Sequence, residues 1–288
     1  MCTLLTRRRA LALPLLGATA AAAQVPPQVV ASFSILADIA RELAGPAALV
    51  TAIVGPGQDA HGFEPWPSDL HRVRAADLAV ANGLGFDPWM DRLVRASGFS
   101  GPFVRAAAAI PPRGADPHAF QDLGNAPAYA RAIADALAGL RPGLAPAIAG
   151  HCADFLDRAA ATDAWVRAEF ATVPAERRLV LTSHDAFGWF GAAYGVKFLS
   201  AQGLSTDSEP SAAEVARLVR RIRDSGVRVL FLETAGNPRL IRQVARDAGV
   251  RLGGTLYSDA LGPPGSTAAT YLGMFRHNVA LMLAAMRG

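Results

Sequence analysis

The chain alternates between short apolar runs and longer stretches in which apolar residues recur every three or four positions. In the first part, apolar runs predict strands at 29–33, 48–54, 78–81 and 103–106. Helical spacing predicts helices at 35–43, 68–75 and 88–96. Strands that alternate with helices are typical of β-α-β units and a parallel sheet. We therefore expect an N-terminal α/β lobe over residues 24–125.

The last part of the chain repeats this pattern. Strands are predicted at 179–181, 227–232 and 250–256, and helices at 185–194, 211–225, 238–248 and 267–286. Ser211 and Glu214 have the spacing of a capping box, and Gly226 is placed to end the helix that they begin. These elements predict a C-terminal α/β lobe over residues 176–288.

Between the lobes, residues 126–175 read as linking helices, at 126–139 and 144–171. As a helix, the 28 residues 144–171 would span about 42 Å, which is the width of a domain or more. The predicted fold is α/β, with two lobes that are each a mostly parallel sheet flanked by helices. One long rigid helix joins them.

Residues 1–23 have the pattern of an export signal. Three arginines, Arg7 to Arg9, precede an apolar run of about ten residues, and four alanines then lead to cleavage near Ala23. The run is too short to cross a bilayer of about 30 Å as a helix. We expect a periplasmic protein, exported by either the general or the twin-arginine route. Removal of the signal leaves Cys152 as the only cysteine and excludes an intramolecular disulfide.

The composition and charge narrow the classes of partner. With 51% hydrophobic and 18% charged residues, the chain has an ordinary globular balance. The formal net charge is +4, and removal of the three signal arginines leaves 25 basic against 24 acidic residues, or +1. This near-neutral balance gives no indication of nucleic-acid binding.

Four side chains stand where predicted strands or turn-rich loops end. His61 lies in the Gly- and Pro-rich loop 55–65, His118 lies in 114–120, and His184 and Asp259 each follow a predicted strand. Ligands of open α/β sheets bind at the carboxyl ends of the strands. Three imidazoles and one carboxylate form a tetrahedral set that suits Zn²⁺. The remaining histidines fall on helical patterns and are interpreted as surface or core residues that bind no metal: His71, His151 and His277.

Several segments resemble one family, and they occur in its order: residues 59–65, 116–122, 182–190, 205–211 and 257–261. The family is that of the periplasmic solute-binding proteins of zinc and manganese ABC transporters, the adhesin-like metal-binding cluster A-I. The resemblance covers nearly all of the mature chain. It implies that His61, His118, His184 and Asp259 are metal ligands, two from each lobe. It also implies high-affinity capture of a divalent metal and its delivery to an ABC permease, without enzymatic activity.

The resemblance also bears on the metal and the partners. Manganese-specific members tend to have a carboxylate at the position of His184, and carboxylates suit the harder Mn²⁺. We therefore expect Zn²⁺, with Mn²⁺ as the alternative. An ABC membrane permease is the expected partner, a periplasmic metallochaperone is a further candidate, and we expect a monomer. The long His- and Asp-rich loop of many zinc members is absent, since residues 106–113 are short and contain neither residue type.

Acidic residues near these segments are candidates to orient the metal ligands or to cap helices. Glu64 is interpreted as a partner that orients an imidazole, and Asp185 as a helix cap. Glu233 stands in the segment 233–238, whose sequence differs from the usual family pattern. Two interpretations of Glu233 stay open: a partner that supports a metal ligand, or a solvated residue at a strand end.

Two other classes of function fit the sequence less well. A secreted zinc-dependent hydrolase would need an open position on the metal, whereas four protein ligands close the site. The chain contains no His-Glu-x-x-His, Gly-x-Ser-x-Gly or Walker motif. An adhesin without metal would leave the three loop histidines unexplained.

Overall fold

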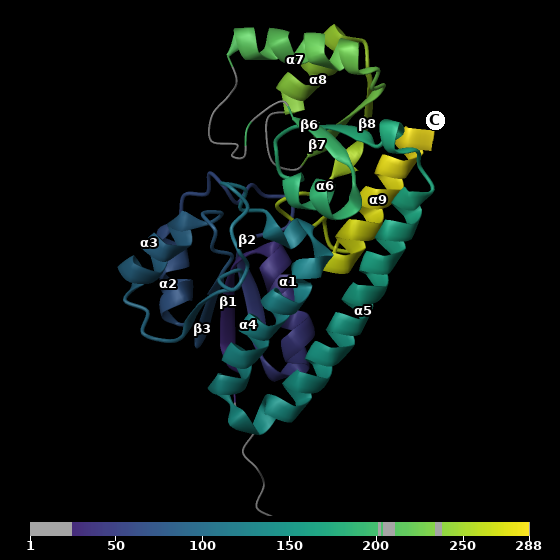
Figure 1. Cartoon of the computed structure of the whole chain (residues 1–288). Coiled ribbons are helices and arrows are strands. Elements are labelled where there is room, and N and C mark those ends of the chain that lie inside the picture. Colours follow the sequence, from purple (N-terminus) through teal and green to yellow (C-terminus); the bar gives the residue numbers. More distant parts are fainter. Residues whose placement is uncertain (1–24, 201–202, 204–210, 234–237, 288) are drawn as a thin grey trace, which may run out of the picture.

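The computed structural model describes residues 25–200, 203, 211–233 and 238–287, and its strands form two four-stranded parallel sheets (Figure 1). The first sheet has the order β2-β1-β3-β4, and the second has the order β6-β5-β7-β8. The expected α/β fold with two sheet lobes is therefore confirmed. The expected signal peptide, residues 205–210 and Asn237 lie outside the described residues.

The first sheet consists of β1 (Gln28–Phe33), β2 (Leu49–Val54), β3 (Leu78–Ala81) and β4 (Phe103–Arg105). The helices beside it are α1 (Ser34–Ala44), α2 (Pro67–Arg74), α3 (Pro88–Ser97) and α4 (Ala126–Leu140). Figure 1 shows α2 and α3 on one side of this sheet and α1 and α4 on the other. All four residues of β3 and five of the six in β1 are buried, as expected for strands covered on both faces.

The linking helix α5 (Ala145–Ala171) has 27 residues, which corresponds to about 40 Å. It packs against α1 at the N-terminal lobe and against α9 (Tyr271–Arg287) near the C-terminal lobe, and Figure 1 shows it running along both lobes. The long helix predicted between the lobes is thus present. None of the helices in the described part of the chain is both long and apolar enough to cross a membrane.

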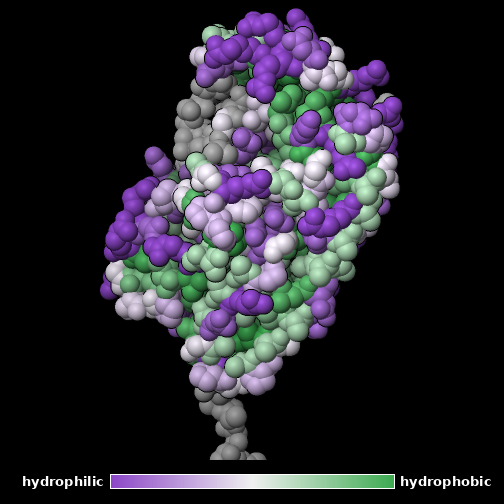
Figure 2. Space-filling view, viewed as in Figure 1, coloured by the Kyte–Doolittle hydropathy of each residue, from purple (hydrophilic) through white to green (hydrophobic). Residues whose placement is uncertain are grey.

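The second sheet consists of β5 (Leu179–Thr182), β6 (Lys197–Ser200), β7 (Val229–Glu233) and β8 (Arg251–Leu256). Its helices are α6 (Gly188–Tyr194), α7 (Ala212–Ser225) and α8 (Pro238–Ala248). Both halves of the capping box at Ser211 and Glu214 are present, and Gly226 follows α7 with a φ of 71°, as the sequence predicts. Figure 2 shows hydrophilic residues gathered over α7, whose opposite side buries Leu218, Val219 and Ile222.

The structure differs from the sequence prediction at three places in this lobe. The strand β6 was not predicted, because its four residues are exposed or half-buried and lack a clear apolar run. The helix expected at Asp185 begins at Gly188, with Phe187 as its N-cap residue at φ −106° and ψ 18°. Asp185 therefore caps no helix. The helix α9 begins at Tyr271 instead of residue 267, because Ala268 accepts a hydrogen bond from the loop residue Gly262.

Asp38 of α1 joins the N-terminal lobe to the start of α9. Its carboxylate accepts a hydrogen bond of 2.7 Å from the Tyr271 backbone N–H, and burial raises its pKa from 3.8 to about 6. Because the folded-state pKa lies above the ordinary value, the charge costs free energy above about pH 6. This cost disappears below about pH 4.

Asp38→Asn keeps an acceptor oxygen and removes the charge. We expect it to raise the free energy of unfolding by roughly 2 kcal/mol at pH 8 and to have little effect at pH 4. Urea unfolding of the two proteins at both pH values measures the difference. An equal change at the two pH values would show that the effect does not come from the charge of Asp38.

Candidate metal centre

The structure brings His61, His118, His184 and Asp259 into one cluster, in which one ligand atom from each lies within 4.8 Å of all the others. His61 lies in the loop after β2, His184 follows β5, and Asp259 follows β8. His118 lies in the loop between β4 and α4, just before a 3₁₀ turn. Segments from the carboxyl ends of strands in both sheets therefore meet at one point, as is typical of open α/β folds.

The distances within the cluster are those of atoms around a common centre. The Nε2 atoms of His61 and His118 are 3.0 Å apart, and each lies 3.5 Å from an oxygen of Asp259. The Nε2 atom of His184 lies 2.8 Å from Asp259 Oδ2. Four ligands at about 2.1 Å from an ion in a tetrahedron are about 3.4 Å from one another. The four side chains therefore need only small adjustments to hold a zinc-sized cation.

The cluster is buried and contains polar atoms without hydrogen bonds of good geometry. The four side chains are at most 4% exposed. Among the described residues, neither ring nitrogen of His184 and neither oxygen of Asp259 has a hydrogen bond of good geometry. Buried polar atoms without partners are costly and rare. A cation at the centre would satisfy the atoms that face it.

Two carboxylates fix the orientation of two of the rings. Asp116 Oδ1 lies 2.7 Å from His118 Nδ1 and also accepts the His118 backbone N–H at 3.0 Å. Glu233 Oε2 lies 2.9 Å from His184 Nδ1. When Nδ1 faces a carboxylate it carries the proton, and Nε2 is free to bind a metal. Both rings thus turn Nε2 toward the centre.

Of the two interpretations of Glu233, the solvated residue is wrong and the supporting partner is correct. Its side chain is fully buried, and Oε1 accepts hydrogen bonds from the backbone N–H groups of Ser183 and His184, at 2.6 and 3.1 Å. The sequence signal was an acidic residue at the end of the buried run that forms β7. The assignment of Glu64 was also wrong, because Glu64 is exposed and Asp116 occupies the orienting position that was expected of it.

His61 is held by its own loop and by aromatic rings. Its backbone N–H donates to Asp59 Oδ1 at 2.9 Å, and the preceding carbonyl of Ala60 accepts from the Trp89 indole at 2.8 Å. The Phe86 ring lies edge-on to the His61 ring, with 4.6 Å between the ring centroids. This apolar wall excludes water from one side of the cluster and strengthens electrostatic interactions within it.

The charges of the cluster influence one another. Burial lowers the pKa of His61. Burial also acts to lower the pKa of His184, but the charges of Glu233 and Asp259 outweigh it and raise the pKa well above the usual range. Burial alone would raise the pKa of Asp259, whereas His184 and the other two imidazoles hold it far below the ordinary value. The negative charges of Asp259 and Glu233 thus favour a positive charge at the centre of the site.

The other histidines lie outside the cluster, as expected. His71 is exposed on α2. Nδ1 of His151 lies 3.2 Å from the Leu43 carbonyl, and Nε2 of His277 lies 3.0 Å from that of Thr255.

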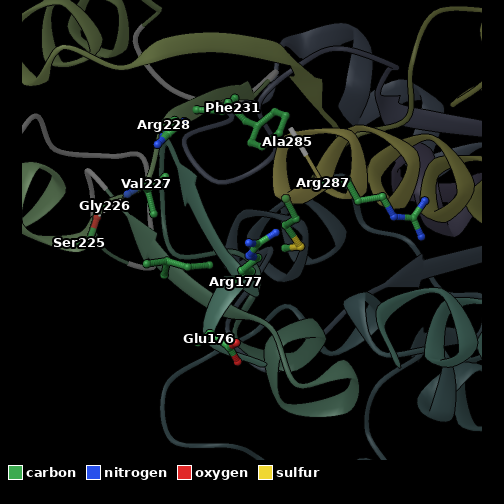
Figure 3. Close-up of a pocket in the computed structure, with 12 residues that line it drawn as sticks. Glu176, Arg177, Ser225, Gly226, Val227, Arg228, Phe231, Ala285 and Arg287 are labelled. Atoms are coloured by element: carbon green, nitrogen blue, oxygen red, sulfur yellow. Dashed lines mark hydrogen bonds between the residues drawn. The ribbon is translucent and has the colours of Figure 1, made fainter. Parts of the chain in front are cut away.

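A separate cavity of about 310 Å³ lies at the opposite end of the C-terminal sheet. Figure 3 shows that it is lined by residues from the turn after α7, from β7 and from the end of α9. Leu179 and Val229, the first residues of β5 and β7, line it, whereas His184 and Glu233 stand at the other ends of these strands. The cavity is therefore distinct from the metal cluster.

Comparison with known proteins identifies the family. Residues 29–285 match the family described as zinc-uptake complex component A, periplasmic (ZnuA). The manganese-binding lipoprotein MntA of Halalkalibacterium halodurans is 33% identical over 257 residues, which cover 88% of this chain and 86% of MntA. The zinc-binding protein TroA of Treponema pallidum is 31% identical over 283 residues, which cover 94% of this chain and 92% of TroA.

The fold agrees with these matches. The solved structure of the TroA periplasmic zinc-binding protein superimposes with a TM-score of 0.87 at 29% identity, over 91% of this chain and 99% of that one. An iron-binding protein, YfeA of Yersinia pestis, is 28% identical. Relatives named for three different metals thus match this chain, and PsaA of Streptococcus anginosus, 28% identical, is named as a manganese ABC transporter substrate-binding lipoprotein. These relatives are binding proteins, not enzymes such as the hydrolase considered above. The chain belongs to the ZnuA family and is a metal-binding, substrate-binding component of an ABC transporter.

Proposed function

We propose that this protein captures zinc outside the cytoplasm with His61, His118, His184 and Asp259, and delivers it to an ABC permease. The observation that supports this proposal best is the convergence of three Nε2 atoms and one carboxylate in a buried cluster. Four protein ligands make a closed site that holds a metal without an open position for catalysis.

The ligand types favour zinc over manganese. Imidazole nitrogens suit the borderline Zn²⁺, whereas Mn²⁺ prefers a larger number of oxygen ligands. The cluster offers three nitrogens and a single carboxylate, while Glu233 is turned to Nδ1 of His184 on the side of the ring away from Asp259. TroA is named for zinc and MntA for manganese, so the family alone leaves this choice open.

We further propose that the signal is cleaved near Ala23 and that the mature protein is a periplasmic monomer. Its lobes meet the linking helices at residues 125 and 175, and a metallochaperone is a further partner. The export pattern of residues 1–23 supports the location, and the family supports a permease as partner.

Competitive titration tests the choice of metal. The mature protein, stripped of metal, is titrated with Zn²⁺ and Mn²⁺ against a chelator of known affinity, and bound metal is quantified by elemental analysis. We expect one Zn²⁺ per chain and a clear preference for it. Preferential Mn²⁺ binding would overturn the zinc assignment and leave the transporter class in place.

We expect zinc affinity to fall as the pH drops, beginning above the ordinary imidazole pKa of about 6.5, because imidazole must be deprotonated to bind the metal. The raised pKa of His184 means that protons compete with zinc for this ring most strongly. The measurement is the same competitive titration between pH 5 and pH 8, with proton release followed by calorimetry in two buffers. An affinity that stays constant over this range would argue against histidine ligands.

A further inference from the structure

Asp259 comes from the C-terminal sheet, but the segment that carries it, residues 257–262, is bonded to the N-terminal lobe. Gln121 Nε2 donates to the Ser258 carbonyl at 2.6 Å, and both groups are buried. The Leu261 backbone N–H donates to Ser34 Oγ at 2.9 Å, and the Leu261 carbonyl accepts from the Gly57 N–H at 3.0 Å. Three hydrogen bonds thus surround Asp259 and attach its segment to the other lobe.

The chain after this segment is attached in the same way. The Tyr271 hydroxyl donates to the Phe120 carbonyl at 2.6 Å, and its backbone N–H donates to Asp38 at 2.7 Å. Tyr271 begins α9, which packs along α5 and α1. The path from Asp259 to the start of α9 therefore follows the N-terminal lobe and the linking helix.

Gln121 connects two residues of the metal site because its own turn directly follows His118. It ends the 3₁₀ turn that follows His118, and its backbone N–H donates to the His118 carbonyl at 2.9 Å. Its side chain is almost fully buried. One short turn therefore fixes the backbone of His118 and, through the Gln121 amide, the backbone beside Asp259.

His184 is attached differently. Its backbone and its ring both contact Glu233 of β7, inside the C-terminal sheet. The helix that follows His184, α6, makes two hydrogen bonds to the N-terminal lobe. The Trp189 indole donates to the Asp116 carbonyl at 3.1 Å, and the Leu123 N–H donates to the Tyr194 hydroxyl at 3.4 Å. Two further bonds attach α6 to the linking helix α5: Tyr194 donates to Asp163 at 2.8 Å, and Arg167 donates to the Ala193 carbonyl at 2.7 Å. The hydrogen bonds from the His184 side to the N-terminal lobe itself are thus fewer and longer than those from the Asp259 segment.

We propose that Gln121 is a positioning residue that holds Asp259 together with His61 and His118 as one preformed unit, from which His184 separates when the metal leaves. This inference rests on the proposed function and specifies how its site opens. Movement of the C-terminal sheet relative to the segment 257–262 would remove one nitrogen ligand and leave three ligands in place. Metal release would then begin at His184.

Distances between spin labels test which parts move together. In the mature chain with Cys152→Ser, one pair of labels is placed at Ala96→Cys of α3 and Pro264→Cys, and another at Ala96→Cys and Ala216→Cys of α7, all at exposed positions. We expect removal of zinc to shift the second distance and to leave the first unchanged. An equal shift of both distances, or no shift of either, would overturn the inference.

Gln121→Leu removes the amide at nearly constant volume. We expect zinc to dissociate about tenfold faster, as expected for the loss of one buried hydrogen bond, and the label at residue 264 to move in the metal-free state. Asn125→Leu is the matched control, because its amide donates to Ala119 at 2.9 Å within the same lobe. Equal effects of the two substitutions would contradict a role for Gln121 in holding Asp259.

The two proposals fail in distinguishable ways. If the unmodified mature protein binds neither zinc nor manganese, the proposed function fails before any distance is measured. If it binds metal and the two label pairs shift together, the function stands and only the preformed unit of three ligands is wrong.

Discussion

Replacement of His184 with alanine is expected to lower zinc affinity by roughly a hundredfold or more. Zinc sites with four protein ligands bind with about 10–16 kcal/mol, so one ligand accounts for about 3 kcal/mol. The lost nitrogen is the one that lies 2.8 Å from Asp259, in a pocket that excludes water. Competition with a chromophoric chelator measures the change in the dissociation constant.

His71→Ala is the matched control, because it removes an imidazole that is exposed on α2. It should leave zinc affinity unchanged. If His184→Ala and His71→Ala bound zinc as tightly as the unmodified protein, His184 would not be a ligand. Circular dichroism of both variants establishes that the fold is intact when affinities are compared.

Replacement of Glu233 with alanine is expected to cost about 3–5 kcal/mol of stability in the metal-free protein, because it breaks a buried ion pair from one side. The Ser183 and His184 N–H groups would lose their acceptor, and the His184 ring would lose the partner of its Nδ1 atom. Urea unfolding in the presence of a chelator measures the change.

Glu233→Gln separates orientation of the ring from overall stability. The amide keeps the shape and one acceptor oxygen but no longer requires a proton on Nδ1, so we expect zinc affinity to fall 10- to 100-fold.

The control for the stability effect of Glu233→Ala is Glu169→Ala, which removes a half-exposed partner of Arg287 and should cost less than about 1 kcal/mol of stability. An effect of Glu233→Ala as small as that of the control would contradict a structural role for this ion pair.

The sequence predicted the lobes and the four candidate ligands because both leave local signals. Buried parallel strands such as β3 are continuous apolar runs, and the turn-rich loop at His61 places a side chain at a strand end. The half-buried edge strand β6 has no such run and was not predicted.

The supporting contacts were harder to predict because they join distant parts of the chain. Glu233 meets His184 across 49 residues, and Gln121 meets Ser258 across 137. Nothing in the local pattern of either residue indicates its partner. Glu64 is closer in sequence to a metal-site histidine than Glu233 is, yet the loop turns it outward. Proximity along the chain was a poor guide to which carboxylate orients an imidazole.

The central claim is that these four side chains bind the metal, and anomalous diffraction at the zinc edge tests it most directly. Crystals of the mature protein loaded with one equivalent of Zn²⁺ should show one strong peak about 2.0–2.2 Å from the Nε2 atoms of His61, His118 and His184 and from a carboxylate oxygen of Asp259. A peak at any other place, with these four side chains free of metal, would contradict the account.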